Sequence, residues 1–340
     1  MPITAGPLGR IAVAMVTPFD SAGELDIEGA RWLAAHLVDE GGCDALVLSG
    51  TTGESPTTSD DEKRALVRAV VAEVGDRACV VAGVGSSDTR HTVALARDAE
   101  AAGADGLLVV TPYYSRPTQE AVAHHLRTVA DATGLPVLLY DIPGRTGTAL
   151  STETLLRLAG HPRIAGVKDC AYDLLKSSQV MARTGLAYYA GCDEFALPLR
   201  AIGGAGCIST VANVAARQVR GVLDAYDAGE GDLAARRHLA LAPLIEAVMT
   251  GQPGTVAAKA LLSARGLPAG PVRGPLLDAD PALTARLLKL LAETETETET
   301  ETETETESEG KGEGEGEAHG ETEPEAGVGA GAGAEVGVRG

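Results

Sequence analysis

One lysine of this chain stands where an amine could do chemistry. Lys168 closes the segment 164–167, which has the length and composition of a short buried strand. The chain has six lysines, and only Lys168 falls at the carboxyl end of a predicted inner strand. Desolvation there disfavours the ammonium form, and a free amine can attack a carbonyl carbon to form a Schiff base. The plainer alternative is a lysine whose stem packs in the strand end while its head reaches water.

Hydroxyl groups and one arginine occupy the neighbouring predicted strand ends. Residues 50–55 read Gly-Thr-Thr-Gly-Glu-Ser, 111–114 read Thr-Pro-Tyr-Tyr, and 140–147 contain Tyr140 and Arg145. Hydroxyls and the backbone N–H groups of a Gly-rich turn suit a small carboxylate, and Tyr and Thr can relay protons. The alternatives are a plain turn at 50–54, a core aromatic at Tyr140 and a loop salt bridge at Arg145.

Metal chemistry is not expected. No histidine falls on these strand ends, and a metal site would require clustered histidines and carboxylates. The five cysteines are scattered and form no Cys-x-x-Cys pair. We therefore predict no metal, no cofactor, and buried free thiols in a reducing compartment.

These residues need a fold that gathers strand ends on one face. From residue 8 to 230, short apolar runs alternate with segments of helical period. Eight strand-helix units argue for a parallel sheet covered on its outside, and eight is the number that closes a (β/α)8 TIM barrel. An open doubly wound sheet is the alternative, disfavoured because no Gly-x-Gly-x-x-Gly turn follows the first strand. The predicted strands are 11–18, 45–50, 80–85, 106–112, 136–143, 164–169, 187–193 and 206–213, with helices such as 27–40, 60–74, 89–102 and 118–132.

Three regions are predicted along the chain: a catalytic barrel over 1–230, a C-terminal helical region over 231–292, and a disordered Glu/Thr/Gly-rich tail over 293–340. The tail carries −14 of the formal charge of −20, which leaves −6 on the first 292 residues. The first 292 residues therefore lack the excess of basic residues expected of a nucleic-acid-binding protein. They also contain no apolar run of membrane-spanning length. The first residues lack the pattern of a signal peptide, so we expect a cytoplasmic protein.

With Gly-Val-Lys-Asp at 166–169 added to these segments, the chain resembles the dihydrodipicolinate synthase family of pyruvate-dependent class I aldolases. The resemblance runs from about residue 8 to about residue 291. It implies a lyase that condenses pyruvate with L-aspartate 4-semialdehyde to give 4-hydroxy-tetrahydrodipicolinate, in lysine and diaminopimelate biosynthesis. It also implies a homotetramer built as a dimer of dimers.

The resemblance further implies a role for four catalytic residues. Lys168 would form the Schiff base with pyruvate. Tyr140 would act as general acid and base, linked through Thr51 to Tyr114, a residue that in this family reaches across a subunit interface.

Four more residues are implied to bind substrate. Thr52, with the turn amides that follow Gly50, would hold the pyruvate carboxylate. Arg145 would receive the carboxylate of the second substrate, a task that suits a planar two-point donor. The backbone carbonyl of Ile208 lies in the corresponding pocket.

Two other functions stay open at this point. The chain could be another pyruvate-dependent Schiff-base aldolase or dehydratase that acts on a keto-deoxy sugar acid, because some such enzymes share the Pro-Gly-Arg-Thr segment at 143–146. It could also be a barrel that has lost catalysis and serves as a scaffold. Every residue that the mechanism needs is present, which argues against the scaffold.

Overall fold

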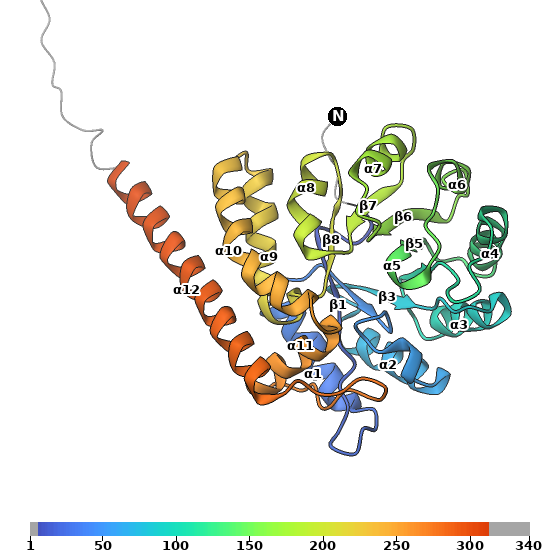
Figure 1. The fold of residues 1–340 in the computed structure, drawn as a ribbon, viewed down its shortest axis with the longest axis horizontal. Coiled ribbons are helices and arrows are strands. Elements are labelled where there is room, and N and C mark those ends of the chain that lie inside the picture. Colours follow the sequence, from blue (N-terminus) through green and yellow to red (C-terminus); the bar gives the residue numbers. More distant parts are fainter. Residues whose placement is uncertain (1–5, 313–340) are drawn as a thin grey trace, which may run out of the picture. The chain divides into compact units, whose positions relative to one another are not determined.

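A closed barrel of parallel strands forms the centre of the protein (Figure 1). The structure is a computed structural model that describes the backbone of residues 6–312 and the side chains of residues 6–296. Over those residues, eight strands follow one another around the barrel in chain order, and the first pairs with the last. They are β1 (Ile11–Ala14), β2 (Ala45–Leu48), β3 (Cys79–Gly83), β4 (Gly106–Val110), β5 (Val137–Asp141), β6 (Ile164–Asp169), β7 (Ala187–Ala190) and β8 (Gly206–Ser209). The predicted (β/α)8 barrel is therefore confirmed, and the alternative of an open sheet is wrong.

Helices connect the strands and surround the barrel on its outside (Figure 1). They are α1 (Ile27–Asp39), α2 (Asp60–Val74), α3 (Thr89–Ala101), α4 (Gln119–Asp131), α5 (Pro143–Thr146), α6 (Thr152–Leu158), α7 (Leu174–Met181), α8 (Ala196–Ala201) and α9 (Ala212–Asp227). Capping side chains define several starts. Helix α2, for example, begins with a capping box in which Ser59 and Glu62 bond each other's backbone N–H groups.

The strands are mainly apolar because both of their faces are buried, and most of their polar residues stand at the carboxyl ends. On β5, Leu138 and Tyr140 belong to the cluster inside the barrel, whereas Val137 and Leu139 belong to the core between the barrel and its helices. This two-residue alternation decides which side chains can reach the barrel interior. It turns Tyr140 inward at the end of its strand.

The chain continues after the barrel with α10 (Gly231–Met249), α11 (Gly254–Ala264) and α12 (Pro281–Gly312). Helices α9 and α10 pack side by side (Figure 1). Leu244, Leu261 and Leu287 of the three last helices are buried in the same core as the barrel helices. The C-terminal helical region is thus present as predicted, while the division of the chain into domains at 230 and 292 stays a prediction.

The described residues up to 298 belong to the first of two units of the chain. All strands and the helices up to the first part of α12 lie in the first unit. The backbone of α12 continues as a helix to Gly312, into the region predicted as a disordered tail. The rest of that predicted tail, residues 313–340, lies outside the described residues.

Candidate active site

The predicted nucleophile lies inside the barrel beside a tyrosine of the adjacent strand. Lys168 on β6 and Tyr140 on β5 are paired in register. Lys168 is only 4% exposed, and its Nζ lies 4.6 Å from the centroid of the Tyr140 ring. The fold therefore brings the two predicted catalytic side chains together at the carboxyl ends of neighbouring strands, the face that carries the active site in barrel enzymes.

A glycine on the next strand makes room for the lysine. A Cβ atom at Gly191, which directly follows β7, would lie 2.9 Å from Cε and from Cγ of Lys168 and 2.4 Å from Sγ of Cys170. Any side chain at this position would displace the stem of the lysine. Gly191 is thus a spatial requirement for the buried amine.

The surroundings of Lys168 favour the free amine. Burial lowers the pKa of Lys168 below its ordinary value, and the neighbouring thiols of Cys170 and Cys192 and the carboxylate of Asp193 oppose this shift only in part. No ion pair with Lys168 forms among the described residues. The direction predicted from the sequence is confirmed: burial lowers the pKa of Lys168, and its amine forms no ion pair among the described residues. The shift favours the free amine, which is the form that attacks a carbonyl.

Tyr140 is held as a neutral phenol. Burial raises the pKa of Tyr140 well above its ordinary value, and the thiol of Cys170 adds to the effect. A hydrogen bond with the hydroxyl of Thr51 and the charge of Arg145 act in the opposite direction. At neutral pH the phenol therefore carries a proton that it can donate, and Thr51 is placed to exchange protons with it.

A cavity of about 380 Å³ opens next to Tyr140. Its wall is formed mainly by hydroxyl-bearing and small residues from the ends of β2 to β5. Five of the predicted site residues line it: Gly50, Thr51, Tyr114, Tyr140 and Arg145. The volume suits small metabolites with a few polar groups.

The other three predicted site residues are buried beside this cavity. Lys168 lies next to the Tyr140 ring inside the barrel. The hydroxyl of Thr52 is 3.0 Å from the hydroxyl of Thr210, and the backbone carbonyl of Thr52 accepts a hydrogen bond from Thr255 at 3.1 Å. Ile208, on β8, belongs to the inner cluster of the barrel.

Arg145 projects from a short helical turn at the rim of the cavity. Pro143 starts α5 directly after β5, and Gly147 ends it with a φ of 73°. Arg145 is exposed, and the described part of the chain gives it no ion pair. The alternative of a loop salt bridge is therefore not what this structure shows, and the guanidinium group can receive an anion.

Tyr114 is the most exposed large side chain of the site. It is 95% exposed and has a φ of 72°, in the left-handed region that non-glycine residues rarely adopt. A tyrosine held outward in this way presents its ring and hydroxyl to whatever molecule lies beyond the cavity mouth.

Ser49 is a cavity residue that sequence reasoning missed. It follows β2 with a φ of 52°, and its hydroxyl is buried without a hydrogen-bond partner in the described part of the chain. A buried hydroxyl that finds no partner costs free energy, so such a group marks a place where a bound molecule can supply one. The signal in the sequence was a serine at the end of an otherwise apolar run.

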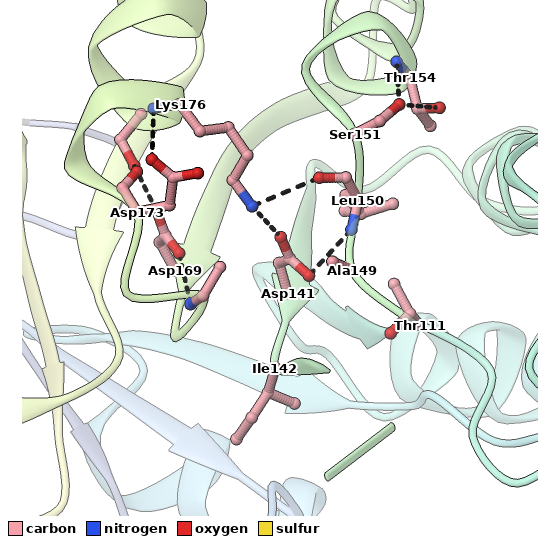
Figure 2. Close-up of polar contacts among 12 residues, drawn as sticks. Thr111, Asp141, Ile142, Ala149, Leu150, Ser151, Thr154, Asp169, Asp173 and Lys176 are labelled. Atoms are coloured by element: carbon pink, nitrogen blue, oxygen red, sulfur yellow. Dashed lines mark hydrogen bonds and ion pairs between the residues drawn. The ribbon is translucent and has the colours of Figure 1, made fainter. Parts of the chain in front are cut away.

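Two aspartates anchor the outer side of the same strand ends (Figure 2). Asp141 follows Tyr140 and meets Nζ of Lys176 at 2.7 Å, while its other oxygen accepts a bond from the backbone N–H of Leu150 at 3.1 Å. Asp169 follows Lys168 and accepts bonds from the N–H of Ala171 and from another side chain. Because neighbours along a strand face opposite ways, these outward anchors fix the inward direction of Tyr140 and Lys168.

No group of three or more His, Cys, Asp or Glu side chains among the described residues could hold a metal ion. No helix of the described part is long and apolar enough to cross a membrane.

A buried lysine without an ion pair among the described residues, at the strand ends of a (β/α)8 barrel and beside a tyrosine and a hydroxyl-lined cavity, fits the class of Schiff-base lyases. The model of the Dihydrodipicolinate synthetase family matches residues 7–294. The chain belongs to this family. It is a pyruvate-dependent lyase with the 4-hydroxy-tetrahydrodipicolinate synthase activity of its relatives, in lysine and diaminopimelate biosynthesis.

Curated relatives and solved structures agree with this assignment. The chain is 64% identical over 290 residues to 4-hydroxy-tetrahydrodipicolinate synthase 1 of Streptomyces coelicolor, covering 85% of this chain and 95% of that protein. It is 56% identical over 286 residues to the synthase of Acidothermus cellulolyticus, covering 84% and 92%. The structure of dihydrodipicolinate synthase DapA-2 from Bacillus anthracis superposes with a TM-score of 0.81 at 36% identity, covering 84% of this chain and 98% of that one.

Proposed function

We propose that Lys168 is the residue on which this enzyme condenses pyruvate with L-aspartate 4-semialdehyde. The observation that carries the proposal is its environment: a 4% exposed amine with a lowered pKa, 4.6 Å from the ring of Tyr140. The amine attacks the keto carbon of pyruvate, and loss of water gives an iminium ion. This ion withdraws electrons from the methyl group, so that a proton leaves and an enamine forms. The enamine carbon then attacks the aldehyde carbon of the second substrate, whose oxygen takes up a proton. The amino group of that substrate adds to the re-formed iminium carbon and displaces the amine of Lys168, which closes the ring and frees the enzyme.

Tyr140 serves as the general acid and base of these steps. Its raised pKa keeps the phenol protonated, and Thr51 is its hydrogen-bond partner. Tyr114 of a second copy of the chain would extend the relay, because in one copy it is 95% exposed at the cavity rim. We assign Thr51 and Tyr114 to this relay.

Two groups hold the carboxylates of the two substrates. Thr52 and the turn amides that follow Gly50 take the pyruvate carboxylate, with the carbonyl of Ile208 in the same pocket. The Thr52 hydroxyl shares one contact with Thr210, and a hydroxyl can make further hydrogen bonds. Arg145, exposed at the rim and free of an ion pair within the described residues, takes the carboxylate of the semialdehyde.

The assembly and location follow from the same assignment. We propose a homo-oligomer, a dimer of dimers, in which Tyr114 completes the site of a neighbouring subunit. A cytoplasmic location fits the five cysteines, all of which are free. Sedimentation analysis of the purified protein tests the assembly: a monomer with full activity would contradict a role for Tyr114 across an interface.

Borohydride reduction in the presence of pyruvate tests the central step. Mass spectrometry of the digested protein should find the reduced pyruvate adduct on Lys168. Assays with pyruvate plus L-aspartate 4-semialdehyde, and then with keto-deoxy sugar acids, determine the second substrate. An adduct on another lysine, or none, would overturn the assignment of Lys168.

A further inference from the structure

A buried ion pair joins the C-terminal helical region to the turn that follows β2. Nζ of Lys259, on α11, lies 2.7 Å from Oε1 of Glu54, and each side chain is 2% exposed. The two residues are 205 positions apart in the chain. Glu54 closes the turn 50–54, which carries the proposed carboxylate-binding groups. A charge pair taken out of water needs close geometry and further hydrogen bonds to be retained, so its position is strictly determined.

Glu54 and Lys259 each make a further hydrogen bond to the segment that follows α11. The second carboxylate oxygen of Glu54 accepts a hydrogen bond from the backbone N–H of Arg273 at 2.8 Å. The ammonium group of Lys259 also donates to the carbonyl of Pro271 at 2.8 Å. One oxygen of Glu54 thus contacts Lys259 on α11, while its other oxygen and the ammonium group of Lys259 both contact the segment that follows α11.

An aromatic ring completes this cluster. Nζ of Lys259 lies 4.0 Å and Cζ of Arg273 lies 4.1 Å from the centroid of the Phe19 ring. The backbone N–H of Phe19 donates to the carbonyl of Ala269 at 3.1 Å. The loop after β1 is thereby connected to the same C-terminal segment as the turn after β2.

The backbone conformation of the turn at Glu54 is one that needs support from contacts elsewhere in the chain. Glu54 has a φ of 55°, a left-handed conformation that costs free energy for a residue with a side chain. Helix α11 contacts the turn a second time, because the hydroxyl of Thr255 donates to the carbonyl of Thr52 at 3.1 Å. The backbone on either side of Gly53 is thus held by α11.

We propose that Glu54 and Lys259 are positioning residues for the pyruvate-binding turn, so that the C-terminal helical region is part of the active site. The inference rests on the proposed role of Thr52 and its turn amides. Neither residue of the pair lines the cavity, so they act through the backbone that they hold. A displaced turn binds the pyruvate carboxylate less tightly.

Two variants test the proposal, Lys259→Met and Glu54→Gln. We expect the KM for pyruvate to rise roughly tenfold to a hundredfold, because weakening a hydrogen bond to a charged group has an effect of that size on binding. We expect kcat at saturating pyruvate to stay within about threefold, and borohydride still to trap the adduct on Lys168. Because KM does not depend on the fraction of folded enzyme, a merely structural pair would leave it unchanged.

Arg265→Met is the matched control. Arg265 caps the end of the same helix and pairs with Glu295 at 2.6 Å, but its side chain is 42% exposed. Breaking this surface pair should leave both kinetic constants at the wild-type values. If Lys259→Met does not fold, Glu54→Gln decides alone, since the amide keeps an oxygen acceptor for the N–H of Arg273.

The outcomes separate this inference from the proposed function. Wild-type KM values in the variants, with only the melting temperature lowered, overturn the inference. Thr52→Val provides the reference: if it raises the pyruvate KM while Glu54→Gln does not, the inference fails and the proposed role of Thr52 stands. If the wild-type protein gives no adduct on Lys168, the proposed function fails and the inference fails with it.

Discussion

Two lysines are buried in this protein to nearly the same extent, in surroundings that differ in one respect. Lys168 is 4% and Lys259 is 2% exposed. Lys259 meets a carboxylate at 2.7 Å, whereas Lys168 has no ion pair among the described residues. Burial lowers the pKa of both, but for Lys259 the hydrogen bond and charge of Glu54 act against that shift.

The difference separates a structural amine from a reactive one. An ammonium ion that is buried with a counter-charge remains an ion and fixes the elements that it joins. An amine that is buried without one is more readily deprotonated and becomes a nucleophile. Burial by itself therefore does not separate the two lysines; the ion pair of Lys259, which Lys168 lacks among the described residues, does.

Replacing the unpaired lysine should have the largest effect. Lys168→Ala removes the nucleophile, so we expect turnover to fall by roughly 10³-fold or more, since no other group can form the covalent intermediate. Coupled assays of the synthase reaction and circular dichroism measure activity and folding. Lys289→Ala, at a side chain that is 76% exposed, is the control and should keep full activity. Substantial turnover by folded Lys168→Ala would refute the assignment of Lys168 as the reactive lysine.

Replacing Tyr140, whose ring lies beside Lys168, should have the next largest effect on activity. Tyr140→Phe removes the acidic proton but keeps the ring, so we expect kcat to fall about 10²- to 10⁴-fold, the range typical of general acid and base groups. Borohydride should still trap some adduct on Lys168. An unchanged kcat would remove Tyr140 from the mechanism.

Tyr189 offers a matched control for this experiment. It is paired in register with Lys168 on the opposite side, and its hydroxyl accepts a bond from the N–H of Leu8 at 2.9 Å. Tyr189→Phe leaves that buried N–H unpaired, so stability should fall by about 1–3 kcal/mol. We expect kcat to change far less than in Tyr140→Phe.

Replacing Lys259, the paired lysine, should change the stability of the protein more than its catalytic activity. Lys259→Met leaves Glu54 as an uncompensated buried charge, which costs about 3–5 kcal/mol. Lys168→Met removes an unpaired buried amine and should be neutral or stabilising. Urea unfolding of both variants measures the two free energies, and equal losses would show that the two lysines do not differ as the contacts indicate.

The fold and the centre of the site were predictable because their signals are local. Each strand appears as an apolar run, and a polar residue that ends such a run stands out, as Lys168 and Tyr140 do. The predicted runs at 11–18 and 206–213 extend past β1 and β8, which end at Ala14 and Ser209. The apolar run continues past β1 because Met15 and Val16 are buried too, each 1% exposed.

The supporting contacts were not predictable because they join distant parts of the chain. The sequence of α11 shows a lysine in a helical segment, and nothing nearby indicates that Glu54 faces it. The pairing of the Thr52 and Thr210 hydroxyls depends likewise on barrel closure, which brings the ends of β2 and β8 within reach. Ser49 was missed because an unpaired hydroxyl is visible only when all its neighbours are placed.

The smallest expected effect is the pH dependence that the unpaired lysine gives to stability. Unfolding returns Lys168 to its ordinary pKa of 10.5, and the folded value is lower. Between the two values the unfolded chain binds more protons, so the free energy of unfolding rises with pH through that window, by about 1.4 kcal/mol per unit of difference. Below the folded pKa the contribution of Lys168 is constant and unfavourable.

Lys168→Met lacks this group, so its stability advantage over the wild type should be constant below the folded pKa, should shrink as the pH rises above that value, and should vanish as the pH passes 10.5. Unfolding curves of both proteins across this range give the difference directly. The rate of adduct formation with pyruvate provides a second reading, since it should rise with pH and level off below 10.5, once the amine is free. A midpoint at or above 10.5 in either measurement would mean that the amine is as well solvated as a surface lysine, and Lys168 would then not differ from the exposed lysines of the chain.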